Sequence, residues 1–157
     1  MNHILAVDLG ATYVRVAIAS LDGKIVAKAK KKVVKEGKED AIAKQIIKIY
    51  ESIRERIGKI IIDKVVIGSI GPLDMRSGVI INPPNLPFAK VVLKDPLEKY
   101  FKTDVLVLND AVSAVWGEKH FGLGRNVENL VYVTLSTGIG VGVVVNGKLL
   151  LGKDGNA

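Results

Sequence analysis

An aspartate followed by a turn of small residues stands near the start of the chain. Asp8 ends the apolar run HILAVD of residues 3–8, and Gly10, Ala11 and Thr12 follow it. A tight turn with small side chains lets backbone N–H groups approach an anion such as phosphate, and a carboxylate at a strand end can hold Mg²⁺ through water. An ordinary hairpin, in which the aspartate accepts from turn amides, explains the same pattern. We interpret Asp8, Gly10 and Thr12 as phosphate-binding, with Asp8 as the magnesium ligand, because a second glycine loop occurs later.

That second loop is the run STGIG, which contains Thr137, Gly138 and Gly140. Glycines permit close approach of the backbone, and a threonine hydroxyl can donate to a phosphate oxygen. The run is not a Walker A motif, because the GxxxxGK[ST] spacing is absent. The alternative is a glycine-permitted turn within a pair of strands. We interpret the loop as a second phosphate contact.

Asn109 and Asp110 follow the apolar run DVLVL of residues 104–108. Open α/β sheets place ligands outside the carboxyl ends of their strands, so Asp110 is well placed to take a proton from a bound hydroxyl group. The alternative for Asp110 is a helix N-cap, and for Asn109 a turn residue at the strand end. We interpret Asp110 as a general base.

The elements that must position these residues are indicated by hydrophobic periodicity. Isoleucines at spacings of three and four predict a helix from Ala41 that ends at Gly58, and Asp22-Gly23 predicts a hairpin turn. The segment 73–88 is rich in Pro, Asn and Gly and is expected to lack long regular structure. Strands are expected at residues 3–8, 13–20, 24–34, 64–70, 104–108, 130–135 and 141–145, and further helices at 96–101 and 111–120.

This order predicts an α/β domain with a mixed sheet that is flanked by helices. The first three strands of the sheet are expected to be antiparallel and the later strands parallel. The last segment echoes the first, since each reads as a strand, a glycine turn, a strand, and then DGKI or NGKL. Such self-similarity indicates a duplicated unit.

Composition narrows the class of protein further. The chain has 157 residues, 48% of them hydrophobic, no cysteine and a net charge of +7. The lack of cysteine excludes disulfides and thiolate metal sites. The sequence has no run of about 18 apolar residues, so we expect no membrane span. A basic surface could attract nucleic acid or anionic substrates. The lysines are spread along the chain apart from the run Lys28, Lys30, Lys31 and Lys32, and no aromatic residues are interleaved with that run, so we expect a solvated surface and no nucleic-acid partner. A cytoplasmic location is expected.

Five motifs occur in one order along the chain: DLGATYVR at 8–15, GSIGPLD at 68–74, NPPNLPF at 82–88, LNDAVSAVWGE at 108–118, and VTLSTGIGVGVVVNGKLLLG at 133–152. Together they resemble the ROK family of sugar kinases, within the actin-like ATPase superfamily and its RNase H-like fold. The resemblance implies ATP-dependent phosphorylation of a hexose, with glucose as the leading substrate, and a requirement for Mg²⁺.

By this resemblance, Asn109, Asn85 and Gly71 contact the sugar, with Asn82 a weaker candidate, and Asp110 is the base. The two glycine loops face the ATP phosphates. The family more often has Gly-Gly-Thr where this sequence has Gly-Ala-Thr, and alanine is small enough to serve.

We expect residues 1–129 to form the first lobe of such a kinase and residues 130–157 to begin a second one, which is cut short. The chain alone is therefore expected to be inactive. The exposed apolar hairpin at 131–151 suggests a homo-oligomer.

Two rival functions remain open from the sequence. A nuclease of the RNase H-like class would use Asp8 and Asp110 as metal ligands, and a non-catalytic module would only bind a sugar. Trp116 and His120 are expected to be packing and helix-end residues, and Arg15 to face solvent.

Overall fold

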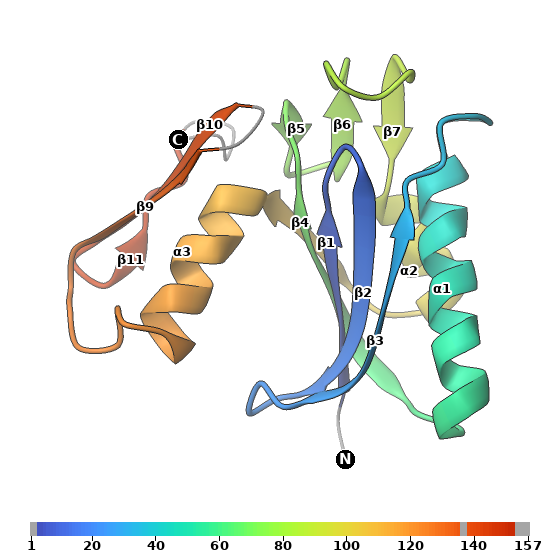
Figure 1. Ribbon diagram of the computed structural model, residues 1–157, viewed down its shortest axis with the longest axis horizontal. Helices are drawn as coiled ribbons and strands as arrows, with labels where there is room; N and C mark the ends of the chain where they lie inside the picture. The colour runs from blue at the N-terminus through green and yellow to red at the C-terminus, as the bar shows by residue number, and fades with distance from the viewer. Residues whose placement is uncertain (1–2, 136–137, 153–157) are drawn as a thin grey trace.

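Five strands form the central sheet of the computed structural model, which describes residues 3–135 and 138–152 (Figure 1). Their order across the sheet is β3-β2-β1-β4-β8. The first three strands pair antiparallel, whereas β4 pairs parallel with β1 and with β8, which confirms the predicted mixed sheet. The bounds are β1 His3–Leu9, β2 Tyr13–Ser20, β3 Ile25–Lys32, β4 Ile62–Ser69 and β8 Val105–Asn109.

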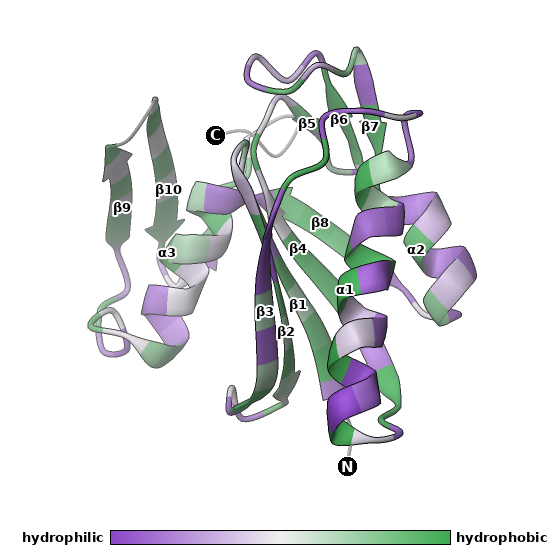
Figure 2. Ribbon diagram, turned by 45° about the vertical axis from the view of Figure 1, so that its right-hand side comes forward, coloured by the Kyte–Doolittle hydropathy of each residue, from purple (hydrophilic) through white to green (hydrophobic). Residues whose placement is uncertain are grey.

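The core lies on one face of this sheet, beneath helices α1 (Ala41–Ile57) and α2 (Lys94–Phe101). Alternate residues of β1 point toward it, and Leu5 and Leu9 are fully buried. Helix α1 buries the isoleucine stripe that the spacing predicted, and Figure 2 shows apolar residues on the sheet beneath it. Gly58 ends the helix as expected, donating to the Arg54 carbonyl at 2.9 Å with φ at 87°.

Helix α2 begins at Lys94, two residues before the predicted start. Pro96 therefore lies in the first turn, where its missing N–H leaves no helical hydrogen bond unmade. The helix ends with Lys102 in the left-handed region, at φ 54°, and the Lys102 amide donates to Glu98.

The segment after β4 contains more regular structure than predicted. A small antiparallel sheet is formed by β5 (Leu73–Asp74), β6 (Val79–Ile81) and β7 (Lys90–Val92). The Asp74 carboxylate accepts from the amides of Arg76 and Ser77 and so closes the turn between β5 and β6. The prediction missed these strands because they are two or three residues long, too short to show a period.

Helix α3 (Asp110–Phe121) lies against the other face of the central sheet and carries a second sheet of order β11-β10-β9 (Figure 1). Its strands are β9 Leu130–Leu135, β10 Ile139–Val145 and β11 Lys148–Leu149. Gly147 turns β10 into β11 with φ at 74°, as Gly23 turns β2 into β3 with φ at 85°. Asn146 also has a positive φ, 50°, whereas Asp22 does not, so the two hairpins share a left-handed glycine but not one turn type.

No helix within the ranges 3–135 and 138–152 has the length and apolar character needed to cross a membrane.

Gly142 allows β10 to lie directly on the backbone of α3. A Cβ built there would collide with the carbonyl of Ala111 and would lie 2.9 Å from Cγ1 of Val115. We predict that Gly142→Ala lowers the free energy of unfolding by about 1–3 kcal/mol, through overpacking. Urea unfolding followed by circular dichroism measures the change.

Gly117→Ala is the matched control, because a Cβ at Gly117 meets nothing within 4 Å. This change in the middle of α3 should stabilise the fold by roughly 0.5–1 kcal/mol, since alanine is the better helix former. Equal effects of the two substitutions would contradict the packing described for β10.

Candidate active site

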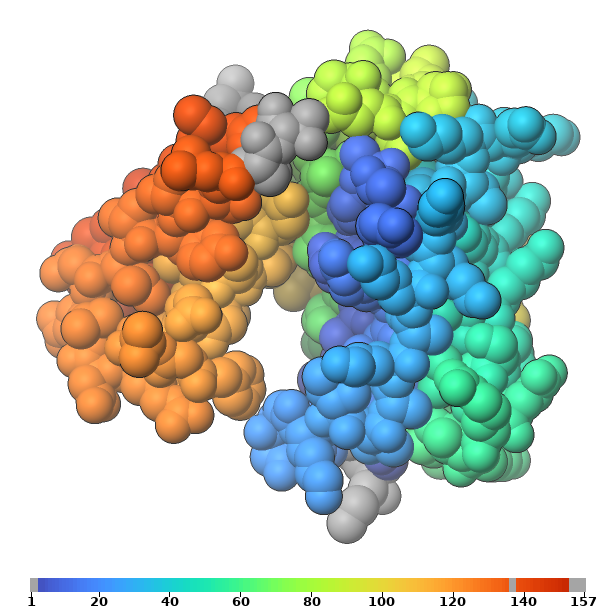
Figure 3. Space-filling model, in the orientation of Figure 1, coloured from blue at the N-terminus to red at the C-terminus, as the bar shows by residue number. Residues whose placement is uncertain are grey.

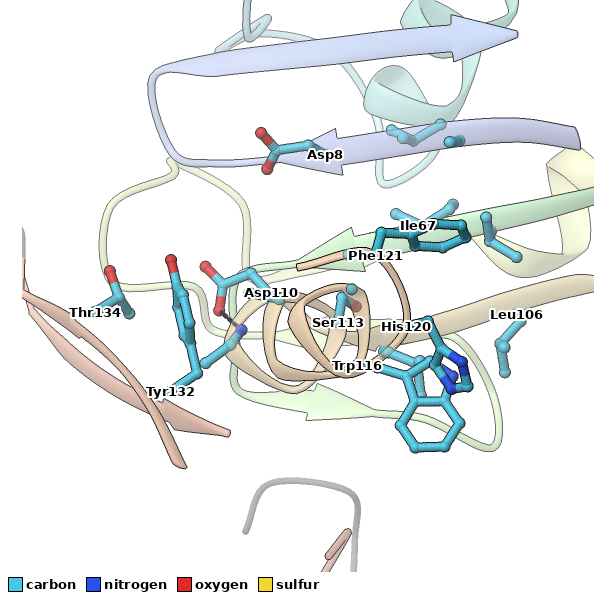
Figure 4. Close-up of a pocket in the computed structure, with 18 residues that line it drawn as sticks. Asp8, Ile67, Leu106, Asp110, Ser113, Trp116, His120, Phe121, Tyr132 and Thr134 are labelled. Carbon is cyan, nitrogen blue, oxygen red and sulfur yellow. Dashed lines mark hydrogen bonds between the residues drawn. The ribbon is translucent and has the colours of Figure 1, made fainter. Parts of the chain in front are cut away.

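A cavity of about 930 Å³ lies between the central sheet and α3, with β9 along one side (Figure 4). Asp8 reaches it from β1, Asp110 from the first position of α3, and Tyr132 and Thr134 from β9. The cavity brings together Asp8 and Asp110, the two carboxylates that the sequence analysis singled out from distant motifs.

The parallel register explains why these carboxylates meet. Asp8 is the register partner of Gly68 in β4, and Gly68 is the partner of Leu108 in β8. Register partners point to the same side of a sheet, and Asp110 follows Leu108 by two positions. Gly68 allows Ser113 of α3 to approach this row closely, since a Cβ at Gly68 would lie 3.1 Å from Oγ of Ser113.

Asp110 is half-buried, and its Oδ1 accepts a hydrogen bond of 2.8 Å from the Ala111 amide. Burial raises the pKa of the Asp110 carboxyl above its ordinary value, the Ala111 amide opposes that shift, and the Asp8 carboxylate adds to it. A raised pKa makes a carboxylate a better proton acceptor. The geometry and the electrostatics therefore suit a general base.

The N-cap of α3 is Asn109, not Asp110. Oδ1 of Asn109 accepts from the amides of Ala111 at 2.9 Å and Val112 at 3.4 Å. The cap role considered for Asp110 is thus wrong. The amide nitrogen of Asn109 has no hydrogen-bond partner among the described residues, so it is the part of this side chain able to contact a ligand.

Arg15 is the site residue that sequence reasoning missed. It faces solvent as expected, with its side chain 52% exposed, and its Nη1 also lies 2.5 Å from Oδ2 of Asp8. The two residues are direct partners across the β1–β2 hairpin. Pairing the predicted strands around the turn at residues 10–12 would have revealed this contact. The guanidinium places a positive charge beside the first phosphate-binding candidate.

The turn after Asp8 is held by its own backbone. The Gly10 amide donates to Tyr13 at 3.0 Å, and the Thr12 carbonyl accepts from Val33 at 3.0 Å. Gly10 therefore uses its N–H within the turn. The amides of Ala11 and Thr12, with the exposed Thr12 hydroxyl, are the donors available to an anion.

The second glycine loop is described only in part, and Thr137 lies outside the described residues. Gly138 is exposed, with open space where a Cβ would be. Gly140 packs against α3, where a Cβ would lie 2.8 Å from Cγ2 of Thr134 and 3.4 Å from Cβ of Ala111. Packing thus gives Gly140 a reason to be glycine besides the predicted phosphate contact.

Gly71 and Asn85 are not among the residues that line the cavity. Gly71 lies two residues beyond Ser69, the register partner of Asn109, and so stands beside the site. Asn85 is exposed in the connection between β6 and β7, which Figure 1 shows at the same end of the sheet as the β1–β2 turn. Their sugar contacts remain predictions.

Trp116 and His120 line the far end of the cavity from α3. Their rings pack edge to face with centroids 4.3 Å apart. This arrangement agrees with the packing role expected for Trp116 and the helix-end position expected for His120.

We predict that Asp110→Asn stabilises the fold at neutral pH. Because the pKa of Asp110 is higher in the folded protein than in the unfolded chain, its ionised form disfavours folding, and asparagine removes that charge. The gain should be present above the folded pKa and should vanish as the pH falls below the unfolded one. Urea unfolding at a series of pH values measures it.

Asp95→Asn is the control, since Asp95 occupies an exposed first-turn position of α2. It should show no such gain at neutral pH. A loss of stability in Asp110→Asn at neutral pH would contradict the assigned environment.

The comparisons with known proteins agree with this geometry. The model of the ROK family matches residues 4–157. A glucokinase of Pyrobaculum calidifontis is 43% identical over 157 residues, covering 100% of this chain and 48% of that protein. This chain therefore spans about half the length of the curated relatives it matches.

Two solved structures share the fold. One is a ROK family glucokinase from Streptomyces griseus in complex with glucose and AMPPNP, with a TM-score of 0.84 and 28% identity over 99% of this chain and 48% of that one. The other is a ROK hexokinase from Thermus thermophilus, with a TM-score of 0.83 and 32% identity over 98% and 50%.

Proposed function

This chain belongs to the ROK family, and on that premise we propose that it supplies the sugar- and phosphate-binding part of an ATP-dependent hexose kinase. The proposed reaction transfers the γ-phosphoryl group of ATP to a hexose hydroxyl, with glucose as the first substrate to test. The neighbouring glucokinase bound to glucose and AMPPNP supports this choice of both substrates. A cytoplasmic location is part of the proposal, because ATP is the donor.

The observation that carries the proposal is the meeting of Asp8 and Asp110 in one cavity at the carboxyl ends of parallel strands. Phosphoryl transfer to an alcohol needs a base near the hydroxyl and donors near the phosphates, held in line. The Asp110 carboxylate is the base, and the turn after Asp8 holds the phosphate donors. Positioning and charge stabilisation then provide most of the rate.

In this mechanism the hydroxyl proton passes to Oδ2 of Asp110, because Oδ1 already accepts a hydrogen bond from the Ala111 amide. The free amide nitrogen of Asn109 donates to a neighbouring sugar hydroxyl, while Gly71 and Asn85 form the rim of the sugar site. The amides at residues 11–12, with Thr137, Gly138 and Gly140, face the phosphates. Arg15 adds positive charge beside them.

Asp8 fits the role of magnesium ligand. Its carboxylate is exposed at a strand end, and oxygen is the donor that Mg²⁺ prefers. The ion would neutralise phosphate charge when bound. The Arg15 guanidinium pairs with Oδ2 of Asp8 and so orients the carboxylate.

Strands β9, β10 and β11 form a sheet separate from the central one, and we propose that residues 130–157 begin the second lobe of the kinase. The relatives are about twice as long as this chain, so the remaining length can supply the rest of that lobe. Family membership favours the kinase over the nuclease among the rival functions.

The test is a coupled assay of ATP-dependent phosphorylation over a panel of hexoses. It compares this chain with a version extended through the second lobe. The extended version should turn over glucose, and Asp110→Asn should lower its kcat by about 10²–10⁴-fold, as expected for loss of a general base. Asp95→Asn, which alters a first-turn aspartate far from the cavity, should leave the rate unchanged.

Turnover that survives Asp110→Asn would overturn the assignment of the base. Hexose binding without phosphorylation would support the non-catalytic sugar module. Cleavage of nucleic acid with Mg²⁺ would instead support the nuclease.

We also propose that this chain self-associates through the outer face of β9 and β10. That face exposes an unbroken set of apolar side chains: Val131, Val133, Leu135, Ile139 and Val141. Exposed apolar patches of this kind mark association surfaces.

Val133→Lys should shift the chain toward the monomer in light scattering coupled to size exclusion, because it places a charge at the centre of the patch. Val26→Lys is the control, at an exposed position of β3. A wild-type chain that is monomeric at every concentration would refute the proposal.

A further inference from the structure

Helix α3 and the sheet it carries form one packed unit. Strand β10 lies on the helix backbone at Gly142, and Val144 is buried beneath it. Gly140 packs closely on Thr134 of β9 and lies within ordinary contact of Ala111 in the first turn of α3. Any displacement of the helix therefore moves the sheet β11-β10-β9 with it.

The unit is joined to the central sheet at the two ends of α3. At the first end the chain passes directly from β8 into α3, and Ser113 donates to the Asn109 carbonyl at 2.9 Å. Ser113 also packs on Gly68, at 3.1 Å from where a Cβ would stand. This end is short, covalent and close-packed, so it is suited to act as a pivot.

At the second end of α3, an aromatic ring contacts the central sheet. Phe121, the last residue of α3, rests on Gly23 in the turn between β2 and β3, where a Cβ would lie 2.8 Å from its Cε1. Between the two ends the helix stands off the sheet over the cavity. Figure 3 shows the opening between the α3 side and the β2–β3 side, which meet again below it.

The contact between Phe121 and Gly23 can be broken at a small cost in free energy. Phe121 is 59% exposed, so parting the two surfaces uncovers little apolar area. The turn itself is firm, because the Gly23 amide donates to Ser20 and the Ser20 hydroxyl donates to Asp22 and to the Lys24 carbonyl. The turn that contains Gly23 is thus fixed, whereas Phe121 belongs to a helix that can move.

Movement at this contact reaches the candidate active site. Asp110 and Thr134 belong to the unit that carries α3, whereas Asp8 belongs to the central sheet. A rotation about the first end of α3 changes the separation of Asp8 and Asp110 and the width of the cavity between them.

We propose that Phe121 is a positioning residue. Its contact with Gly23 sets the angle between the α3 unit and the central sheet, and this angle keeps the cavity between them narrow. Release of the ring from Gly23 opens the cavity. Only the catalytic consequence of this movement rests on the proposed kinase function, because the contact and the cavity are features of the fold.

The test uses Trp116, which is the one tryptophan of the chain and lines the cavity. Acrylamide quenching of its fluorescence reports how open the cavity is. Phe121→Ala should raise the quenching constant on the order of twofold, because losing the ring frees that end of α3 to open locally. Leu123→Ala is the matched control, since Leu123 is 99% exposed just beyond the helix and should leave quenching unchanged.

Phe121→Leu keeps an apolar contact with the turn and should give an intermediate constant, and it replaces Phe121→Ala if that variant does not fold. Thermal unfolding followed by circular dichroism checks that each variant is folded. Equal quenching in the Phe121 variants and in Leu123→Ala would overturn the proposal. The measurement needs neither hexose nor ATP, so its failure is distinct from failure of the kinase assay.

Discussion

The candidate site depends on the parallel pairing of β1, β4 and β8. This pairing aligns Asp8, Gly68 and Leu108 in one row, on the sheet face where α3 begins. The absence of a side chain at Gly68 lets Ser113 of the first helical turn approach the sheet, and this approach brings Asp110 to the cavity that Asp8 lines. A side chain at Gly68 would crowd Ser113, because its Cβ would lie 3.1 Å from the serine Oγ.

The two carboxylates occupy different surroundings, and this difference suits different roles. Asp8 is exposed and paired with the Arg15 guanidinium, so its charge is compensated within the protein. Asp110 is half-buried and close enough to Asp8 for that charge to raise its pKa further. One carboxylate thus carries a charge balanced by a guanidinium, and the other is made more basic.

Glycine sets the shape of the second side of the site in a different way. At Gly142 the missing side chain allows β10 to lie on α3, so the helix that bears Asp110 also carries the strands beside the second glycine loop. Asp110 and this loop are thus parts of one body, and the turn after Asp8 is part of another. A site assembled from two bodies joined by a helix end can change its width without unfolding either body.

Much of the architecture followed from local patterns in the sequence. The isoleucine spacing predicted helix α1, and Gly58 predicted where it ends. Both signals are local, because a 3.6-residue period and a C-terminal glycine depend only on residues close together in the chain. The short strands β5, β6 and β7 escaped prediction, since two or three residues display no period and their stability comes from packing.

The chemistry of the site divides in the same way between sequence and tertiary structure. The types and order of Asp8, Asn109 and Asp110 were enough to indicate a phosphate turn, a polar contact and a base. Only the tertiary structure showed that Asn109 caps the helix, that Arg15 forms an ion pair with Asp8, and that Phe121 contacts Gly23. These contacts depend on strand register and on how far a helix stands from a sheet, and such distances are fixed by packing between residues far apart in the chain.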